Sequence, residues 1–124
     1  MRNFGTMLLM CTLATSACAE WVRLGTSGAS AYYLDVATLQ TVNGYRQAWD
    51  LWNVTAEVEE DEASRLTLRE FDCHAARFRV LAFSDHAGRM GVGKTYAKSQ
   101  TPGPWQFAQP ATLPMLSLRK ACAL

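Results

Sequence analysis

The pattern in this chain that most resembles a reactive site is Gly88–Thr95 (GRMGVGKT), which fits G-x-x-x-x-G-K-T, the pattern of a nucleotide-binding P-loop. A P-loop binds phosphate through its backbone N–H groups and through the first turn of the helix that follows it. Here only Tyr96–Thr101 separate Thr95 from a Pro-Gly-Pro break, and that segment is too short for such a helix. The pattern therefore favours a glycine-rich turn between two strands, and nucleotide binding through Gly88–Thr95 is the weaker alternative.

Two histidines stand beside other residues that can bind metals. His74 follows Asp72 and Cys73, and His86 follows Asp85. A zinc site needs three or four converging ligands, and on a strand Asp72 and His74 would share a face that Cys73 does not. No serine lies in the turn that presents a hydrolase nucleophile. We therefore predict no metal site, no catalytic residue and no cofactor, and we expect both histidines to be solvated or hydrogen-bonded.

Composition narrows the class of protein. The 124 residues, 49% of them hydrophobic and 19% charged, suffice for one small domain and exclude a disordered tail. The net charge of +1 argues against a nucleic-acid binder, which normally carries a basic excess. The acidic run Glu57–Glu62 lacks the glycine and the alternating ligands of a calcium loop, so it predicts a solvated hairpin connection.

The N-terminal segment is typical of a cleavable secretory signal. Arg2 supplies one positive charge, and Phe4–Ala14 contains none. Ala17 and Ala19 place small residues three positions and one position before a cut between Ala19 and Glu20. The apolar stretch is about half of the ~20 residues that a membrane-spanning helix requires. We therefore expect residues 1–19 to be a signal peptide and the chain to be exported to the periplasm or the cell surface.

A lipid anchor at Cys18 is the alternative for the same segment. Cys18 follows the small residues Ser16 and Ala17, as the lipidated cysteine of a lipoprotein does. Thr15, however, stands three positions before it, where lipoprotein signals usually carry leucine. Cleavage after Ala19 is therefore the leading prediction. No later segment is long and apolar enough to span a membrane.

Export leaves two cysteines in the mature chain, Cys73 and Cys122. In an oxidising compartment, a cysteine pair in a small domain is more often a disulfide than a metal or catalytic site. A bridge between them would close a loop of about 50 residues, and the chain-entropy model assigns about 4 kcal/mol of stability to a bridge that closes such a loop. We therefore predict a Cys73–Cys122 disulfide.

Residues 20–124 contain no repeat or linker, and we expect them to form one domain. Their hydrophobic period is mostly two, which indicates strands. An Asn43-Gly44 pair predicts a hairpin turn. The expected strands are Glu20–Leu24, Ser30–Val36, Tyr45–Thr55, Ser64–Cys73, Ala76–Ser84 and Gly88–Lys98, with a short extended piece at Trp105–Ala108.

From Thr112 onward the period lengthens to that of a helix. Thr112 is the expected N-cap, and Ala111, Met115, Leu118 and Cys122 would lie on one apolar face. The predicted fold is therefore of the α+β class: an antiparallel sheet of about six strands, with a C-terminal helix packed on one face and tethered by a disulfide.

The order of several short motifs resembles the surface-adhesin protein E family over essentially all of residues 20–124. The motifs are Trp21, Tyr32-Tyr33-Leu34-Asp35, Ala48-Trp49, Glu70-Phe71-Asp72-Cys73, and Trp105 through Pro110 to Cys122. The resemblance implies an antiparallel sheet with a C-terminal helix held by a disulfide. It also implies a homodimer and a protein ligand, namely a host matrix protein such as vitronectin or laminin.

The two tryptophans of Tyr45–Thr55 have opposite parity, so a regular strand turns them to opposite faces. Trp49 matches the core position of the family, which leaves Trp52 as the better candidate for a surface or dimer contact. We therefore expect an exported, non-enzymatic binding or adhesin-like domain of the bacterial cell envelope. The alternatives are a periplasmic structural protein, a lipid-anchored envelope protein, and the nucleotide binder described above.

Overall fold

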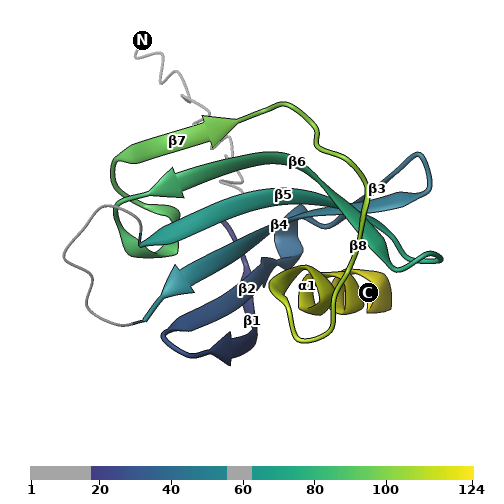
Figure 1. The fold of residues 1–124 in the computed structure, drawn as a ribbon, viewed down its shortest axis with the longest axis horizontal. Helices are drawn as coiled ribbons and strands as arrows, with labels where there is room; N and C mark the ends of the chain where they lie inside the picture. Colours follow the sequence, from purple (N-terminus) through teal and green to yellow (C-terminus); the bar gives the residue numbers. More distant parts are fainter. Residues whose placement is uncertain (1–17, 56–62) are drawn as a thin grey trace, which may run out of the picture.

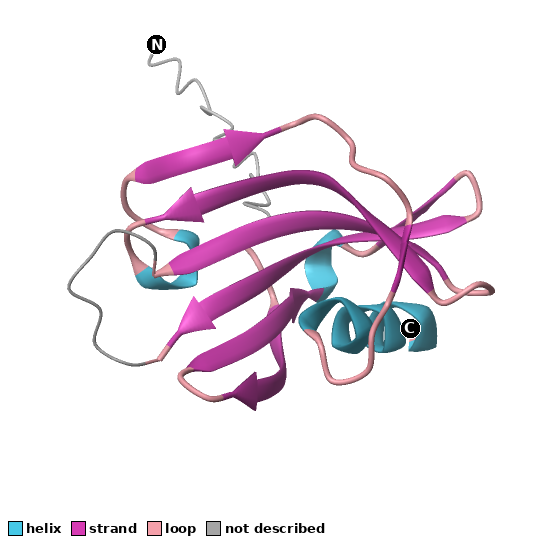
Figure 2. Ribbon diagram, in the orientation of Figure 1, coloured by secondary structure: helices cyan, strands magenta, loops and turns pink. Residues whose placement is uncertain are grey.

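The computed structural model describes residues 18–55 and 63–124. Most of the expected signal peptide and the acidic run Glu57–Glu62 lie outside the described residues. The described chain forms a twisted antiparallel sheet with one helix against one face (Figure 1, Figure 2). The elements are β1 Trp21–Ser27, β2 Ser30–Asp35, the 3₁₀ turn η1 Val36–Thr38, β3 Gln40–Val42, β4 Tyr45–Val54, β5 Ser64–Asp72, β6 Arg77–His86, the 3₁₀ turn η2 Arg89–Gly91, β7 Thr95–Ser99, β8 Gln106–Phe107 and α1 Leu113–Ala123.

The strands follow the order β1-β2-β4-β5-β6-β7, and every neighbouring pair is antiparallel. The short strands β3 and β8 pair with β4 and β6. The predicted fold, an antiparallel sheet of about six strands with a C-terminal helix, is therefore confirmed, with β3 as an addition and β8 within the expected extended piece Trp105–Ala108. A strand of three residues such as β3 carries too little alternation to be recognised in a sequence.

The turn between β3 and β4 follows directly from its two residues. Asn43 has a φ of 51° and Gly44 a φ of 83°. A two-residue hairpin turn that matches the strand twist needs positive φ at both positions, and Asn-Gly adopts it at little cost. The predicted turn is present, and it brings Val42 opposite Tyr45.

The main core lies between the sheet and α1. Every second side chain of a strand points to the same face, so each of the central strands contributes residues to this core. A fully buried leucine or phenylalanine contributes roughly 1.5–3 kcal/mol relative to an exposed one. The buried cluster consists of Leu34, Ala48, Phe71, Phe78, Ala108, Leu118 and Ala121.

α1 begins where the sequence predicts, but its buried face differs. The Thr112 side chain accepts a hydrogen bond from the backbone N–H of Met115 at 3.4 Å, which confirms it as the N-cap. The predicted apolar face was wrong at Ala111, which precedes the helix, is exposed and has a φ of 59°. The other three predicted residues do face the core: Leu118 is buried, and Met115 and Cys122 are partly buried against it. The buried residues of the helix are Leu113, Ser117, Leu118 and Ala121.

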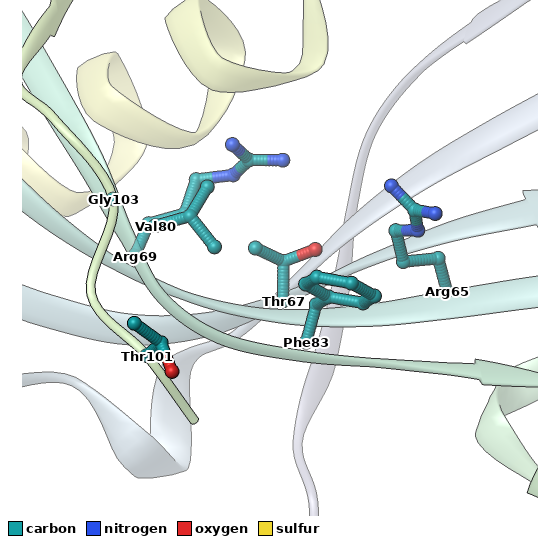
Figure 3. A pocket seen from close by; sticks show the side chains of 7 residues that line it. All are labelled: Arg65, Thr67, Arg69, Val80, Phe83, Thr101 and Gly103. Carbon is teal, nitrogen blue, oxygen red and sulfur yellow. The ribbon is translucent and has the colours of Figure 1, made fainter. Parts of the chain in front are cut away.

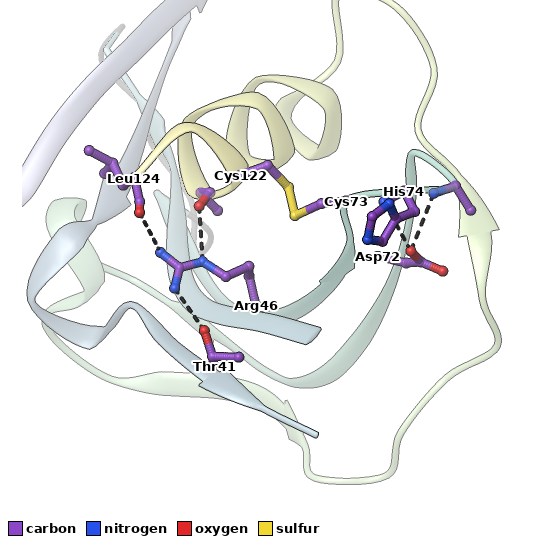
Figure 4. The surroundings of a disulfide bond; sticks show 9 residues. Thr41, Arg46, Asp72, Cys73, His74, Cys122 and Leu124 are labelled. Atoms are coloured by element: carbon purple, nitrogen blue, oxygen red, sulfur yellow. Dashed lines mark hydrogen bonds between the residues drawn. A yellow bond between two sulfur atoms is a disulfide. The ribbon is translucent and has the colours of Figure 1, made fainter. Parts of the chain in front are cut away.

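The C-terminal end of α1 is held by a disulfide and by an arginine (Figure 4). Cys73 and Cys122 are bonded, with their Cα atoms 5.7 Å apart, as predicted. Arg46 of β4 donates from Nε to the carbonyl of Ala121 and from Nη2 to that of Leu124, each at 3.1 Å. These carbonyls have no partner within the helix, so Arg46 supplies the capping that every helix end needs.

The expected strand Ser64–Cys73 ends one residue early, because Cys73 begins the turn to β6. The first strand, in contrast, runs to Ser27 rather than ending at Leu24, and pairs with β2 through a bulge.

Within the described residues, α1 spans 11 residues, and no helix there is long and apolar enough to cross a membrane.

Candidate functional site

The face of the sheet that carries α1, here called the helix face, is only partly covered by the helix. Beside α1 lies a hollow of about 320 Å³, lined by Arg65, Thr67, Arg69, Val80, Phe83, Thr101 and Gly103 (Figure 3). A second hollow of about 330 Å³ shares Arg65 and Arg69 with it and is also lined by Tyr32, Trp52 and Leu113. We call the two together the two-arginine groove.

Strand register brings the groove residues together. Arg65, Thr67 and Arg69 alternate along β5, so all three side chains point to the helix face. Trp52 of β4 lies opposite Arg65, and Tyr32 of β2 lies opposite Trp52. The rings of Tyr32 and Trp52 and the guanidinium group of Arg65 therefore form a row across β2, β4 and β5. This row lies at the end of the sheet that α1 leaves uncovered.

Arg65 is fixed by a carboxylate and an aromatic ring. Its Nε and Nη2 donate to the two carboxylate oxygens of Asp85 at 2.5 and 2.9 Å. The guanidinium also lies 4.7 Å from the centroid of the Phe83 ring. Asp85 is buried, whereas 43% of the Arg65 side chain is exposed. The pair therefore presents its positive partner to solvent with its orientation largely fixed.

Arg69 marks the boundary between the groove and the core. Its Nε donates to Oδ2 of Asp50 at 2.5 Å, and the hydroxyl of Ser117 in α1 donates to the same oxygen at 2.8 Å. Asp50 is completely buried. Burial raises the pKa of its carboxyl group, although Arg69 and the Ser117 hydroxyl act in the opposite direction. This trio links the sheet to the helix.

The arginines of the opposite face are paired with carboxylates and lie against an aromatic ring. Arg77 pairs with Asp72 at 2.9 Å, and Arg79 pairs with Glu70 at 2.8 Å. The ring of Trp105 lies 4.8 Å from the Arg77 guanidinium and 5.1 Å from that of Arg79. Arg77 and Arg79 are 36% and 33% exposed, but neither lines the two hollows, which Arg65 and Arg69 do.

The structure places the two tryptophans of β4 on opposite faces, as their parity predicts. Trp52 is half-buried and lines the two-arginine groove. Trp49 is also half-buried and lies on the face away from α1. The resemblance to the family implied a core position for it, but it is not part of the buried cluster beneath the helix. The role of Trp52 as a surface or dimer contact stays a prediction.

The Gly88–Thr95 segment forms the turn between β6 and β7, which confirms the glycine-rich turn. Thr95 begins a strand and not a helix, and the expected strand Gly88–Lys98 is confined to Thr95–Ser99. The backbone N–H groups of Met90 and Gly91 donate to Asn53 and Ser64, and that of Gly88 donates to the carbonyl of Val92. Groups that would bind phosphate in a P-loop are therefore used within the fold.

The histidines are placed apart from each other. His74 is exposed in the turn after β5, so the expectation that Asp72 and His74 share a strand face was wrong. Asp72 instead accepts hydrogen bonds from the backbone N–H groups of His74 and Ala75 (Figure 4). Nε2 of His86 lies 2.7 Å from the hydroxyl of Ser84, so this histidine is hydrogen-bonded as expected, with a partner that the sequence did not indicate. In the part of the chain that the structure describes, no three metal-binding side chains converge.

The predicted cleavage point lies at the edge of the folded part. Ala19 and Glu20 are exposed and precede β1. The backbone nitrogen of Glu20 lies 2.8 Å from Oδ1 of Asp35, and its carbonyl accepts a hydrogen bond from Val36. The chain is therefore tied to the sheet from Glu20 onward.

The same fold occurs in solved structures of Haemophilus influenzae protein E. Crystal form II of that protein has a TM-score of 0.65 at 16% identity, covering 83% of this chain and 87% of that chain. A second structure of it has a TM-score of 0.62 at 16% identity, with 83% of each chain covered. At this identity the similarity shows the fold alone.

No curated protein sequence matches this chain. A sequence model of the surface-adhesin protein E family, in contrast, matches residues 21–123. That match spans β1 to the last residue of α1 and so includes every strand and the disulfide described above. The chain therefore belongs to the surface-adhesin protein E family.

Proposed function

We propose that this chain is an exported, non-enzymatic binding domain of the bacterial cell envelope that holds a protein partner in the two-arginine groove. The observation that supports this proposal is the row formed by Tyr32, Trp52 and Arg65 beside open space. Tryptophan, tyrosine and arginine are the residues that most often dominate protein–protein binding energy. The family name adds the expectation of an adhesin.

The groove chemistry is suited to binding and not to proton transfer. An arginine guanidinium stays protonated and cannot act as a general base. Arg65 and Arg69 are each held by a buried carboxylate that is already hydrogen-bonded. The side chains that line the groove therefore supply directional donors and aromatic surface, which a binding domain needs.

Paired tryptophan variants test the proposal. The processed chain would be measured by surface plasmon resonance against immobilised host matrix proteins such as laminin and vitronectin. We expect Trp52→Ala to weaken binding by about tenfold or more, as truncation of a central aromatic contact does. Trp49→Ala is the matched control, because Trp49 lies in the same strand, is also half-buried and faces away from the groove. Equal effects of the two variants would contradict binding through the groove.

Export and processing form a separate proposal. We infer that the chain is cut between Ala19 and Glu20 and acts in the periplasm or at the cell surface. Mass spectrometry of the protein isolated from its own cells would then give an unmodified N-terminus at Glu20. A lipid on Cys18 would instead support the lipid-anchored alternative and overturn simple secretion.

The resemblance to the family also supports a homodimer, with Trp52 as a candidate contact. Sedimentation of the processed chain at increasing concentration would show a dimer that dissociates on dilution. A monomer at every concentration would remove this proposal and leave the groove to a different partner.

A further inference from the structure

Arg69 offers donors that the described part of the protein does not use. Its Nε is bonded to Asp50, while Nη1 and Nη2 have no hydrogen-bond acceptor among residues 18–55 and 63–124. The same side chain lines both hollows of the groove. A guanidinium fixed at Nε presents its two terminal nitrogens as a parallel pair of donors, which matches the two oxygens of a carboxylate.

The carboxylates near the groove are buried, whereas the arginines that pair with them line it. Asp50 is 0% exposed and Asp85 6% exposed, and each is paired. Among the described residues that line the two hollows, the charged ones are Arg65 and Arg69. An incoming carboxylate therefore meets the terminal nitrogens of Arg69, whereas an incoming cation meets guanidinium groups of like charge.

The wall beside these donors is aromatic. Tyr32 and Trp52 stand in one row with Arg65, and Phe83 lies beneath the Arg65 guanidinium. Each hollow, at about 320 and 330 Å³, lies within the range of roughly 300–1,000 Å³ typical of ligand sites. The groove therefore has room for an apolar side chain next to the group that meets the arginines.

We propose that the two-arginine groove binds an acidic segment of the partner protein, with a side-chain carboxylate on Nη1 and Nη2 of Arg69 and a neighbouring aromatic side chain against Trp52 and Tyr32. This inference rests on the proposed function, because it names the chemistry of the partner at the same site. It also distinguishes the groove from the opposite face, where the Arg77 and Arg79 guanidinium groups lie against the ring of Trp105 and line neither hollow.

A short peptide tests the acidic group directly. The probe is Gly-Gly-Glu-Phe-Gly-Gly, acetylated and amidated so that the glutamate carries its single carboxylate. It would be titrated into the ¹⁵N-labelled processed chain and followed by NMR. We expect the largest shifts at the amides of Trp52, Arg65 and Arg69, and an affinity about tenfold higher than that of the glutamine version, as loss of a charge-assisted hydrogen bond implies. Equal affinity of the two peptides, or shifts confined to β7, would overturn the proposal.

A conservative variant tests Arg69 itself. Arg69→Lys keeps a cation beside Asp50 but removes the paired donors, so we expect it to lower affinity for the glutamate peptide about tenfold and to leave the glutamine peptide unaffected. Arg119→Lys, on the exposed side of α1, is the matched control. Wild-type affinity in Arg69→Lys would overturn the assignment. If that variant does not fold, the affinities of the glutamate and glutamine peptides for the unaltered chain still test whether the groove prefers a carboxylate.

The two proposals fail in different ways. If Trp52→Ala alone weakens binding to an immobilised matrix protein while glutamate and glutamine peptides bind equally, the groove remains the binding surface and the acidic partner is overturned. If Trp52→Ala and Trp49→Ala are equivalent and the peptides also bind equally, both the binding surface and its partner chemistry are overturned.

Discussion

The helix face of the sheet has two halves with different chemistry. Beneath α1 it presents Leu34, Ala48 and Phe71, all completely buried. Beyond the helix it presents Trp52 and Arg65 to an open hollow. The same strands supply both halves, since β4 carries Ala48 and Trp52, and β5 carries Phe71 and Arg65. Strand alternation fixes the face of each side chain, whereas the position of α1 decides whether that side chain forms a core or a surface.

The boundary between the halves is polar and paired. Asp50 receives hydrogen bonds from Arg69 on the groove side and from Ser117 on the helix side. Its other carboxylate oxygen, Oδ1, is buried and has no hydrogen-bond partner among the described residues. A buried ion pair rarely adds net stability, but it can fix how two elements fit together. We interpret Asp50 as the residue that sets where α1 lies on the sheet.

The largest expected effect contrasts the two halves by truncation. Phe71→Ala in the covered half should lower the free energy of unfolding by about 3–5 kcal/mol, because it leaves a cavity in a packed core. Trp52→Ala in the open half should cost only about 1 kcal/mol, since its side chain is half-exposed. Urea denaturation of both variants measures the difference. Similar losses would show that the open half is part of the core.

The disulfide provides the second test, at the opposite end of the helix from the groove. Cys122→Ser should lower the free energy of unfolding by roughly 2–5 kcal/mol, less where α1 packs well without the bridge. Hydrogen exchange should show α1 losing protection before β4 and β5. Ala123→Ser, which introduces the same side chain at an exposed neighbouring position, is the control. Two free thiols in the denatured, unreduced chain of residues 20–124, which has no other cysteines, would contradict the bridge.

Acid titration sharpens the comparison at the boundary. Because burial raises the pKa of Asp50 above its ordinary value of 3.8, the native chain holds this proton at pH values where the unfolded chain has released it. Wild-type stability relative to Asp50→Asn should therefore fall as the pH rises from that value through the raised pKa. Denaturation of both proteins across this range gives the profile.

Asp72, the last residue of β5 and the neighbour of the disulfide, should show the opposite sign. The hydrogen bond from Arg77, together with those from the Ala75 and His74 amides, lowers its pKa below 3.8. Its contribution should be present above 3.8 and be lost as the pH falls through the lowered pKa, relative to Asp72→Asn. Parallel profiles in the two variants would contradict the opposite pKa shifts that desolvation of Asp50 and hydrogen bonding to Asp72 produce.

Local patterns were enough to predict most of the fold. The Asn43-Gly44 turn, the Thr112 cap and the Cys73–Cys122 bridge each depend on a few residues close in sequence or on a count of cysteines. The groove depends instead on register across strands, because Tyr32 and Trp52 become neighbours only when β2 pairs with β4. A single sequence contains no direct signal for that register.

The burial of Asp50 and the exact start of α1 could not be predicted from the sequence either. The burial of Asp50 depends on where α1 lies, and a carboxylate in an alternating strand gives no sign that a helix will cover it. The error at Ala111 arose because the hydrophobic period extends to a residue two positions before the helix begins at Leu113. Parity correctly separated Trp49 from Trp52, but it could not show which of the two faces would carry the helix.

The smallest expected effect lies at the turn beyond the groove. Lys94→Ala should change the free energy of unfolding by less than about 0.5 kcal/mol, as is usual for an exposed surface position. The turn around it is held by backbone hydrogen bonds, including those from Ala87 to Lys94 and from Gly88 to Val92, that the substitution leaves in place. Nζ of Lys94 lies 5.0 Å from the centroid of the Tyr96 ring, and such a contact adds little stability when it is solvated. Calorimetric titration of the unaltered chain with ATP should show no heat of binding, and ATP binding that disappears in Lys94→Ala would make this turn, and not the open half of the helix face, the functional site.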